Sequence, residues 1–140
     1  MLEEIGKKFL ELKPEVVLGR ARATYLPIPT GFSHIHYEWN ICGRKQKNLD
    51  VALHFETTDK NINEDWIRKL LPCKGELEER LGEKVHFGSW SHVGGSHRWS
   101  KISVSRRVGY EIDDKTKTWA AGTMAKMYEV LTPEIEKRAI

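Results

Sequence analysis

The sequence predicts an α+β fold: an antiparallel β-sheet of about four to five strands with helices packed mainly on one face. Three observations carry this prediction. Two neighbouring segments alternate apolar and polar residues with period two, other segments repeat apolar residues at helical spacing, and 140 residues suit one domain. We therefore expect residues 1–140 to form a single domain with the element order α-β-β-β-α-β-β-α.

The N-terminal segment predicts a short helix followed by an edge strand. Four apolar residues recur at helical spacing until Pro14 ends the pattern. They are Leu2, Ile5, Phe9 and Leu12. The run GRARATYLPIP at residues 19–29 has strand character, and its two prolines suit a strand at the edge of a sheet.

Residues 33–56, SHIHYEWNICGRKQKNLDVALHFE, predict a β-hairpin because apolar and polar residues alternate on both sides of a basic turn. If the apolar residues share one face, the simplest register pairs Trp39 with Val51 and Tyr37 with Leu53. We expect these side chains to be buried under helices, with the polar residues on the opposite, solvent-facing side.

The central segment predicts a helix that is interrupted in its middle. Its apolar stripe consists of Trp66, Leu70, Cys73, Leu77 and Leu81. Asn61 or Asn63 can cap its N-terminus, whereas Pro72 and Gly75 are expected to kink or break it.

The C-terminal part predicts two further strands and a long helix. The strand segments are residues 84–90 and 98–112, and the helix opens near residues 115–119. Its expected buried face consists of Ala120, Met124, Met127, Leu131 and Ile135. Thr132 followed by Pro133 looks like a second helix start, so we expect a bend there.

Composition excludes several classes of protein. A net charge of +3 and 39% hydrophobic residues are ordinary for a globular domain and permit contact with nucleic acid without requiring it. Cys42 and Cys73 are too few for a disulfide framework or a thiolate zinc site, which indicates a reducing compartment. No segment resembles an export signal or a membrane span, so we expect a cytoplasmic protein.

Five runs of the sequence resemble a prokaryotic family of domains of unknown function, DUF4268. They are YLPIPTGFSHIHYEWNI, VALHFET, ELEERLGEKVHF, RWSKISV and WAAGTMAKMYEVLTPEIEKR. Members of the family are frequently the C-terminal part of proteins whose N-terminal part is similar to restriction-endonuclease-like nucleases. The resemblance implies a setting in DNA metabolism or defence. Within that setting we expect a noncatalytic module of a nuclease or defence system, which docks nucleic acid or a nuclease-like protein.

Nuclease activity of the chain itself is not expected. Restriction-like nucleases place Glu-x-Lys, Gln-x-Lys or Asp-x-Lys on a strand, where the acid holds a divalent cation and the lysine helps to position water. None of the predicted strands carries such a motif, and the single Asp-x-Lys, from Asp113 to Lys115, falls in a loop.

Basic residues supply candidate nucleic-acid contacts on the hairpin turn and on the strands. The turn carries Arg44, Lys45 and Lys47, and the strand segments carry Arg20, Arg22, Arg98, Lys101, Arg106 and Arg107. Such a ribbon can contact phosphates. The alternative is that turn lysines keep the hairpin soluble and protect the sheet edge from aggregation.

A second candidate site lies on the polar face of the hairpin, where the expected register sets His36 opposite His54 and His34 opposite Glu56. Together with Glu38, these imidazoles and carboxylates can reach one divalent metal ion, such as zinc or iron. A cofactor is otherwise not expected. The alternative is an ordinary solvent-facing sheet surface, which can also form a homodimer interface.

The loop between the last two predicted strands carries aromatic and imidazole side chains around two glycines. They are Trp90, His92, His97 and Trp99. These rings can stack on unpaired bases, or the two tryptophans can anchor the ends of the loop in the core.

Overall fold

The computed structural model describes residues 1–43, 45–91 and 98–139, and their element order confirms the predicted α+β fold. The elements are α1 (Leu2–Leu12), β1 (Tyr25–Pro29), β2 (Ile35–Cys42), β3 (Lys47–Phe55), α2 (Lys60–Leu70), the 3₁₀ turn η1 (Leu71–Cys73), α3 (Lys74–Leu81), β4 (His86–Ser91), β5 (Arg98–Val108) and α4 (Asp114–Arg138).

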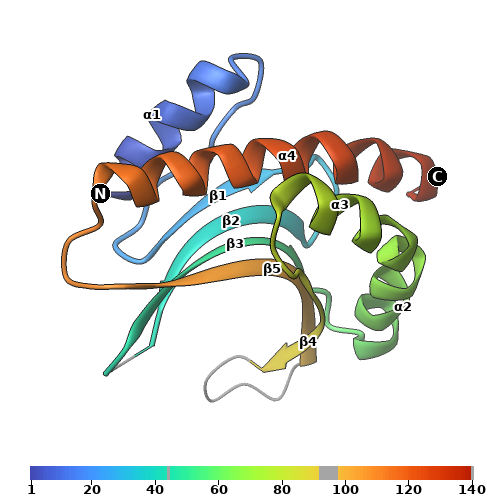
Figure 1. Cartoon of the computed structure of the whole chain (residues 1–140). Helices are drawn as coiled ribbons and strands as arrows, with labels where there is room; N and C mark the ends of the chain where they lie inside the picture. The colour runs from blue at the N-terminus through green and yellow to red at the C-terminus, as the bar shows by residue number, and fades with distance from the viewer. Residues whose placement is uncertain (44, 92–97, 140) are drawn as a thin grey trace.

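The five strands form one antiparallel sheet in the order β1-β2-β3-β5-β4 (Figure 1). The register of β2 against β3 is the predicted one, because Trp39 pairs with Val51 and Tyr37 pairs with Leu53. Among the described residues, β1 and β4 are the edge strands, and Pro27 and Pro29 occupy β1 as the sequence predicted.

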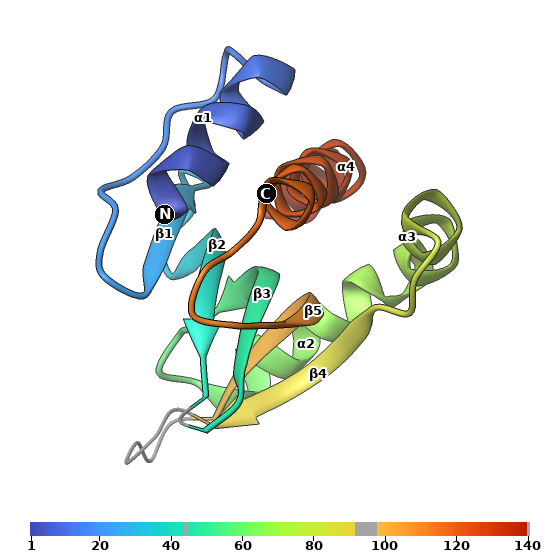
Figure 2. The same cartoon turned by 60° about the vertical axis from the view of Figure 1, so that its left-hand side comes forward.

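Helices α1, α3 and α4 lie over one face of the sheet, while α2 packs beside β5 and β4 (Figures 1 and 2). Trp39 is central to this layer: its ring meets Phe9 of α1 edge-on at 5.3 Å, and its Nε1 donates a 3.0 Å hydrogen bond to the carbonyl oxygen of Ala120 in α4. The buried indole therefore packs against one helix and is hydrogen-bonded to another. Within the described residues, no helix has the length and apolar character needed to cross a membrane.

The interruption of the central helix is confirmed, but its predicted cap is wrong. The chain turns through η1 between α2 and α3, with Pro72 in the turn. Asp59 is the N-cap of α2, and its side chain accepts a 2.8 Å hydrogen bond from the backbone N–H of Asn61. Asn63 is instead buried, where its amide bonds Thr57 and the carbonyl oxygen of Arg98 and so ties α2 to the start of β5.

The last helix has no second start at Thr132, contrary to prediction. Helix α4 passes through Pro133 without interruption. Proline removes one backbone donor from a helix interior, but Leu131 and Ile135 are buried on either side and hold this turn against the core. The Thr132 hydroxyl lies 2.8 Å from the Tyr37 hydroxyl, so it connects the helix to β2.

We expect Leu53→Ala to lower the free energy of unfolding by about 2–5 kcal/mol, because it leaves a cavity in a fully buried part of the core. Urea unfolding followed by circular dichroism measures the change. Lys7→Ala on the exposed side of α1 is the control and should change stability by less than about 0.5 kcal/mol. A cost for Leu53→Ala as small as that of the control would contradict the packing.

Candidate functional site

The sheet face away from the helices is polar but largely hidden from solvent, which corrects the expectation of an ordinary exposed surface. Only 1% of His54, 6% of Glu38 and 5% of Asp50 is exposed. The strands bend in Figure 1 so that this face is the inner side of the curve. Polar side chains on it therefore contact one another more than they contact water.

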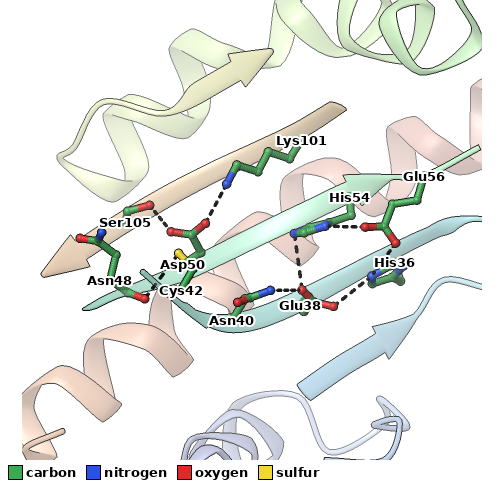
Figure 3. A network of polar contacts seen from close by, with 10 residues as sticks. All are labelled: His36, Glu38, Asn40, Cys42, Asn48, Asp50, His54, Glu56, Lys101 and Ser105. Atoms are coloured by element: carbon green, nitrogen blue, oxygen red, sulfur yellow. Dashed lines mark hydrogen bonds and ion pairs between the residues drawn. The ribbon is translucent and has the colours of Figure 1, made fainter. Parts of the chain in front are cut away.

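Two histidines and two glutamates form a compact group on β2 and at the end of β3 (Figure 3). His36 and His54 face each other across the strand pair, with ring centroids 5.3 Å apart. Nε2 of His36 lies 3.2 Å from Oε1 of Glu38 and 3.7 Å from Oε1 of Glu56. His54 lies between the same two carboxylates, with Nδ1 3.1 Å from Oε2 of Glu56 and Nε2 3.7 Å from Oε2 of Glu38.

Nδ1 of His54 lies within hydrogen-bond distance of Glu56. An ionised carboxylate only accepts hydrogen bonds, so Nδ1 is the protonated nitrogen of this contact when Glu56 is ionised. In the neutral ring, Nε2 then has a lone pair on the side of Glu38. A carboxylate behind a histidine in this way is the usual means of orienting a metal-binding imidazole.

Burial and pairing act in opposite directions on the acid–base behaviour of this group. Burial alone would raise the pKa of Glu38, but the hydrogen bond from His36, the charge of His54 and the 2.7 Å hydrogen bond from Asn40 outweigh it and lower that pKa. Burial would likewise lower the pKa of His36, but the hydrogen bond to Glu38 and the charges of Glu56 and Glu38 raise it. The fold thus favours a protonated His36 beside an ionised Glu38.

A cavity of about 530 Å³ opens in front of this group. Four strands contribute to its lining: β1 with the residue before it, β2, the end of β3 and the start of β5. The lining residues are Thr24, Tyr25, Pro27, His36, Glu38, Asn40, Glu56 and Trp99. Two carboxylates and no lysine or arginine are among these described lining residues, so the cavity favours a cation or a ligand rich in hydrogen-bond donors.

Further along the same face, Asp50 is already paired. Its carboxylate accepts a 2.8 Å hydrogen bond from Nζ of Lys101 and a short one from the Ser105 hydroxyl, both on β5. The strand register explains this grouping, because Asp50 pairs with Ser105 and lies near Lys101 on the same side of the sheet. Lys101 is therefore part of an internal ion pair, which removes it from the predicted basic surface.

Three of the five predicted metal ligands come together. Metal-binding atoms of His36, Glu38 and His54 all lie within 4.8 Å of one another. Glu56 contacts both rings and is placed to orient them. His34 lies exposed in the turn before β2 with φ of 65°, and only its backbone carbonyl meets Glu56, so the structure does not bring it into this group.

The predicted basic residues separate into several places. Arg106 and Arg107 are neighbours on β5 and so point to opposite faces; Arg106 stacks on Trp119 at 4.2 Å and pairs with Glu83. Lys45, Lys47 and Arg107 line one small pocket at the tip of the β2–β3 hairpin. The remaining exposed arginines of this prediction lie elsewhere: they are Arg20, Arg22 and Arg98. Arg44 lies outside the described residues.

The predicted aromatic loop falls mostly outside the described part of the chain. His92 and His97 lie outside it, as does the side chain of Trp90. Trp99, at the start of β5, lines the cavity beside Glu56. Stacking on bases and anchoring of the loop ends both stay predictions.

The two acid-x-lysine tripeptides in the sequence lie away from the strands. Glu11-Leu12-Lys13 is at the C-terminal end of α1, and Lys13 pairs with Glu129 of α4. Asp113 caps the N-terminus of α4 by accepting a hydrogen bond from the backbone N–H of Thr116. Neither arrangement has the strand geometry of a restriction-like nuclease centre.

A family model described as a domain of unknown function (DUF4268) matches residues 2–137, almost the whole chain. Comparison with curated proteins and with solved structures gives no match.

We expect His36 of the metal-free protein to titrate with a pKa above its ordinary value of about 6.5, and Glu38→Gln to lower that pKa because the charged acceptor is lost. NMR titration of the imidazole C–H signals measures both. Since the folded-state pKa is raised, protonated His36 stabilises the fold below about pH 6.5, and this contribution disappears as the pH rises through the folded-state pKa.

Glu76→Gln, in the exposed part of α3, is the matched control for this titration and should leave the His36 signal unchanged. An equal His36 pKa in the wild type and in Glu38→Gln would show that the two side chains are not paired in solution.

Proposed function

The chain belongs to the DUF4268 family, and we propose that it is a domain that binds a divalent transition-metal ion in the hollow of its sheet. One observation carries this proposal: two imidazoles and one carboxylate converge, with their metal-binding atoms within 4.8 Å of one another, at a cavity of about 530 Å³. The ligands would be His36, Glu38 and His54.

The types of ligand select the kind of metal. Imidazole nitrogen with carboxylate oxygen suits zinc or iron(II), whereas magnesium and calcium prefer oxygen ligands alone. Glu56 supports metal binding through imidazole nitrogen, because its hydrogen bond with Nδ1 of His54 would leave Nε2 as the coordinating nitrogen. A bound ion would also replace the proton that His36 shares with Glu38, so binding should release protons.

Three protein ligands leave a coordination position free, as is common in catalytic rather than structural metal sites. His36 and Glu38 line the cavity, so this position would face it, while His54 lies beneath them and is buried. Water or a small organic molecule could then coordinate the ion. Such a site can support hydrolysis, because a metal ion makes bound water more acidic.

The family resemblance adds a separate proposal about the setting. The resemblance supports a role beside a nuclease or within a defence system, in the cytoplasm of a prokaryote. This proposal concerns the binding partners of the protein and not the reaction at the metal site. A homodimer through the polar sheet face remains a further prediction, and it would compete with access to the cavity.

We expect the wild-type protein, after treatment with a chelator and dialysis, to bind about one zinc or cobalt(II) ion per chain, because three ligands converge on one position. Isothermal titration calorimetry gives the stoichiometry, and the visible spectrum of the cobalt form reports nitrogen and oxygen coordination. His36→Ala, Glu38→Gln and His54→Gln should each weaken binding at least about tenfold, since each removes a ligand. Glu56→Gln should weaken it less.

His86→Ala is the matched control, because it removes an exposed histidine of β4 that is not part of the group. Metal at about 100 times its wild-type dissociation constant should also raise the free energy of unfolding of the wild type by about 2.7 kcal/mol. The same concentration should raise that of His36→Ala by about 1.4 kcal/mol or less, because its binding is at least about tenfold weaker. Retention of full metal affinity by His36→Ala and Glu38→Gln would refute the site.

A further inference from the structure

A second, chemically opposite pocket lies at the tip of the β2–β3 hairpin. It has a volume of about 190 Å³ and is lined by Lys45, Gln46, Lys47, Arg107, Val108, Gly109 and Tyr110. We call it the tip pocket. The two chain segments that line it are adjacent because the pairing of β3 with β5 extends to Lys47 and Val108, at the hairpin tip.

Among the described residues, no acid neutralises the positive charges of the tip pocket. Lys45, Lys47 and Arg107 form no ion pair with a carboxylate in the described part of the chain, and no aspartate or glutamate is among the described lining residues. Arg107 donates instead to the neutral Oε1 of Gln46 at 2.5 Å, which holds its guanidinium at the pocket. By contrast, Lys101 and Arg106 of the same strand are both paired with acids.

An aromatic ring stands beside these cations. Tyr110, two residues after the end of β5, is 92% exposed, and Nζ of Lys47 lies 5.8 Å from the centre of its ring. Ile112, two residues on, is buried and anchors the segment. A large aromatic side chain that is left in water gains little from burial, but it offers a flat surface for a planar ligand.

We propose that the tip pocket binds single-stranded nucleic acid, with Lys45, Lys47 and Arg107 contacting phosphates and Tyr110 stacking on a base. Single-strand binding sites combine two components: cations that follow the phosphate backbone, and exposed aromatic rings on which the bases stack. Bases of a duplex are stacked on one another and cannot cover the face of Tyr110. This site is separate from the proposed metal site, with which it shares no lining residue among those described.

The test is fluorescence anisotropy with a labelled oligothymidine of about 15 nucleotides, long enough for a site of this kind. The wild type should bind it with an affinity that falls steeply as salt rises. Removal of all three cations in Lys45→Gln/Lys47→Gln/Arg107→Gln should reduce the slope of log affinity against log salt by about two units, because each single-strand contact contributes about 0.7. Tyr110→Ala should weaken binding about 5- to 100-fold at unchanged slope.

The triple variant Lys7→Gln/Lys84→Gln/Lys126→Gln removes the same number of exposed cations from α1, the α3–β4 connection and α4, and it should bind like the wild type. Circular dichroism confirms that all variants are folded. Equal weakening by this control, equal affinity for a duplex of the same length, or full binding by Tyr110→Ala would each overturn the proposal. So would the absence of binding by the wild type at low salt.

Discussion

The register of β2 against β3 is the constraint on which the rest of the molecule depends. Side chains alternate between the two faces of a strand, so a slip of one residue would move every apolar side chain of the hairpin to the polar face. Trp39 makes such a slip costly, because its indole packs on Phe9 and donates to Ala120 from a fully buried position. The same register places His36 opposite His54. Core packing on one face therefore determines the chemistry on the other.

Curvature of the sheet turns that polar face into an enclosed site. A flat sheet would leave His54 and Glu38 in water, where their mutual attraction would be weak. Here they are buried, and an isolated buried charge would be costly. Each acid is satisfied by neighbours on the same face: Glu38 by Asn40 and His36, and Asp50 by Lys101 and Ser105. The network also holds the side chains in place before any ligand arrives.

Much of the fold could be predicted from the sequence because the relevant signals are local. Period two gave the hairpin register through Trp39 and Val51, and helical spacing gave the stripe of α4 from Ala120 to Ile135. The N-cap of α2 could not be predicted from the sequence, because Asp59 and Asn63 are both residue types that cap helices. In the structure Asn63 bonds the start of β5 instead, and Asp59 is the cap.

The sites were predicted only in part because their assembly depends on tertiary structure. The alternation of polar and apolar residues identified His36, Glu38 and His54 as members of one sheet face. Their burial results from the curvature of the sheet, which no pattern in the sequence indicates. The grouping of Arg107 with Lys45 and Lys47 depends on β5 pairing with β3, which joins segments far apart in the chain. Tyr110 gave no signal at all: a tyrosine after a strand is equally consistent with a buried position, and its exposure is visible only in the structure.

The internal pairing of charges explains how a chain of 140 residues with a net charge of only +3 can carry two regions of opposite charge. Asp50 neutralises Lys101 within the sheet, and Glu83 neutralises Arg106 on the helix side. The lining that remains is acidic at the cavity, through Glu38 and Glu56, and basic at the tip pocket. Because exposed charges are screened within about 8–10 Å at physiological salt, each region acts on its own surroundings. Local pairing, rather than net charge, therefore sets what each surface attracts.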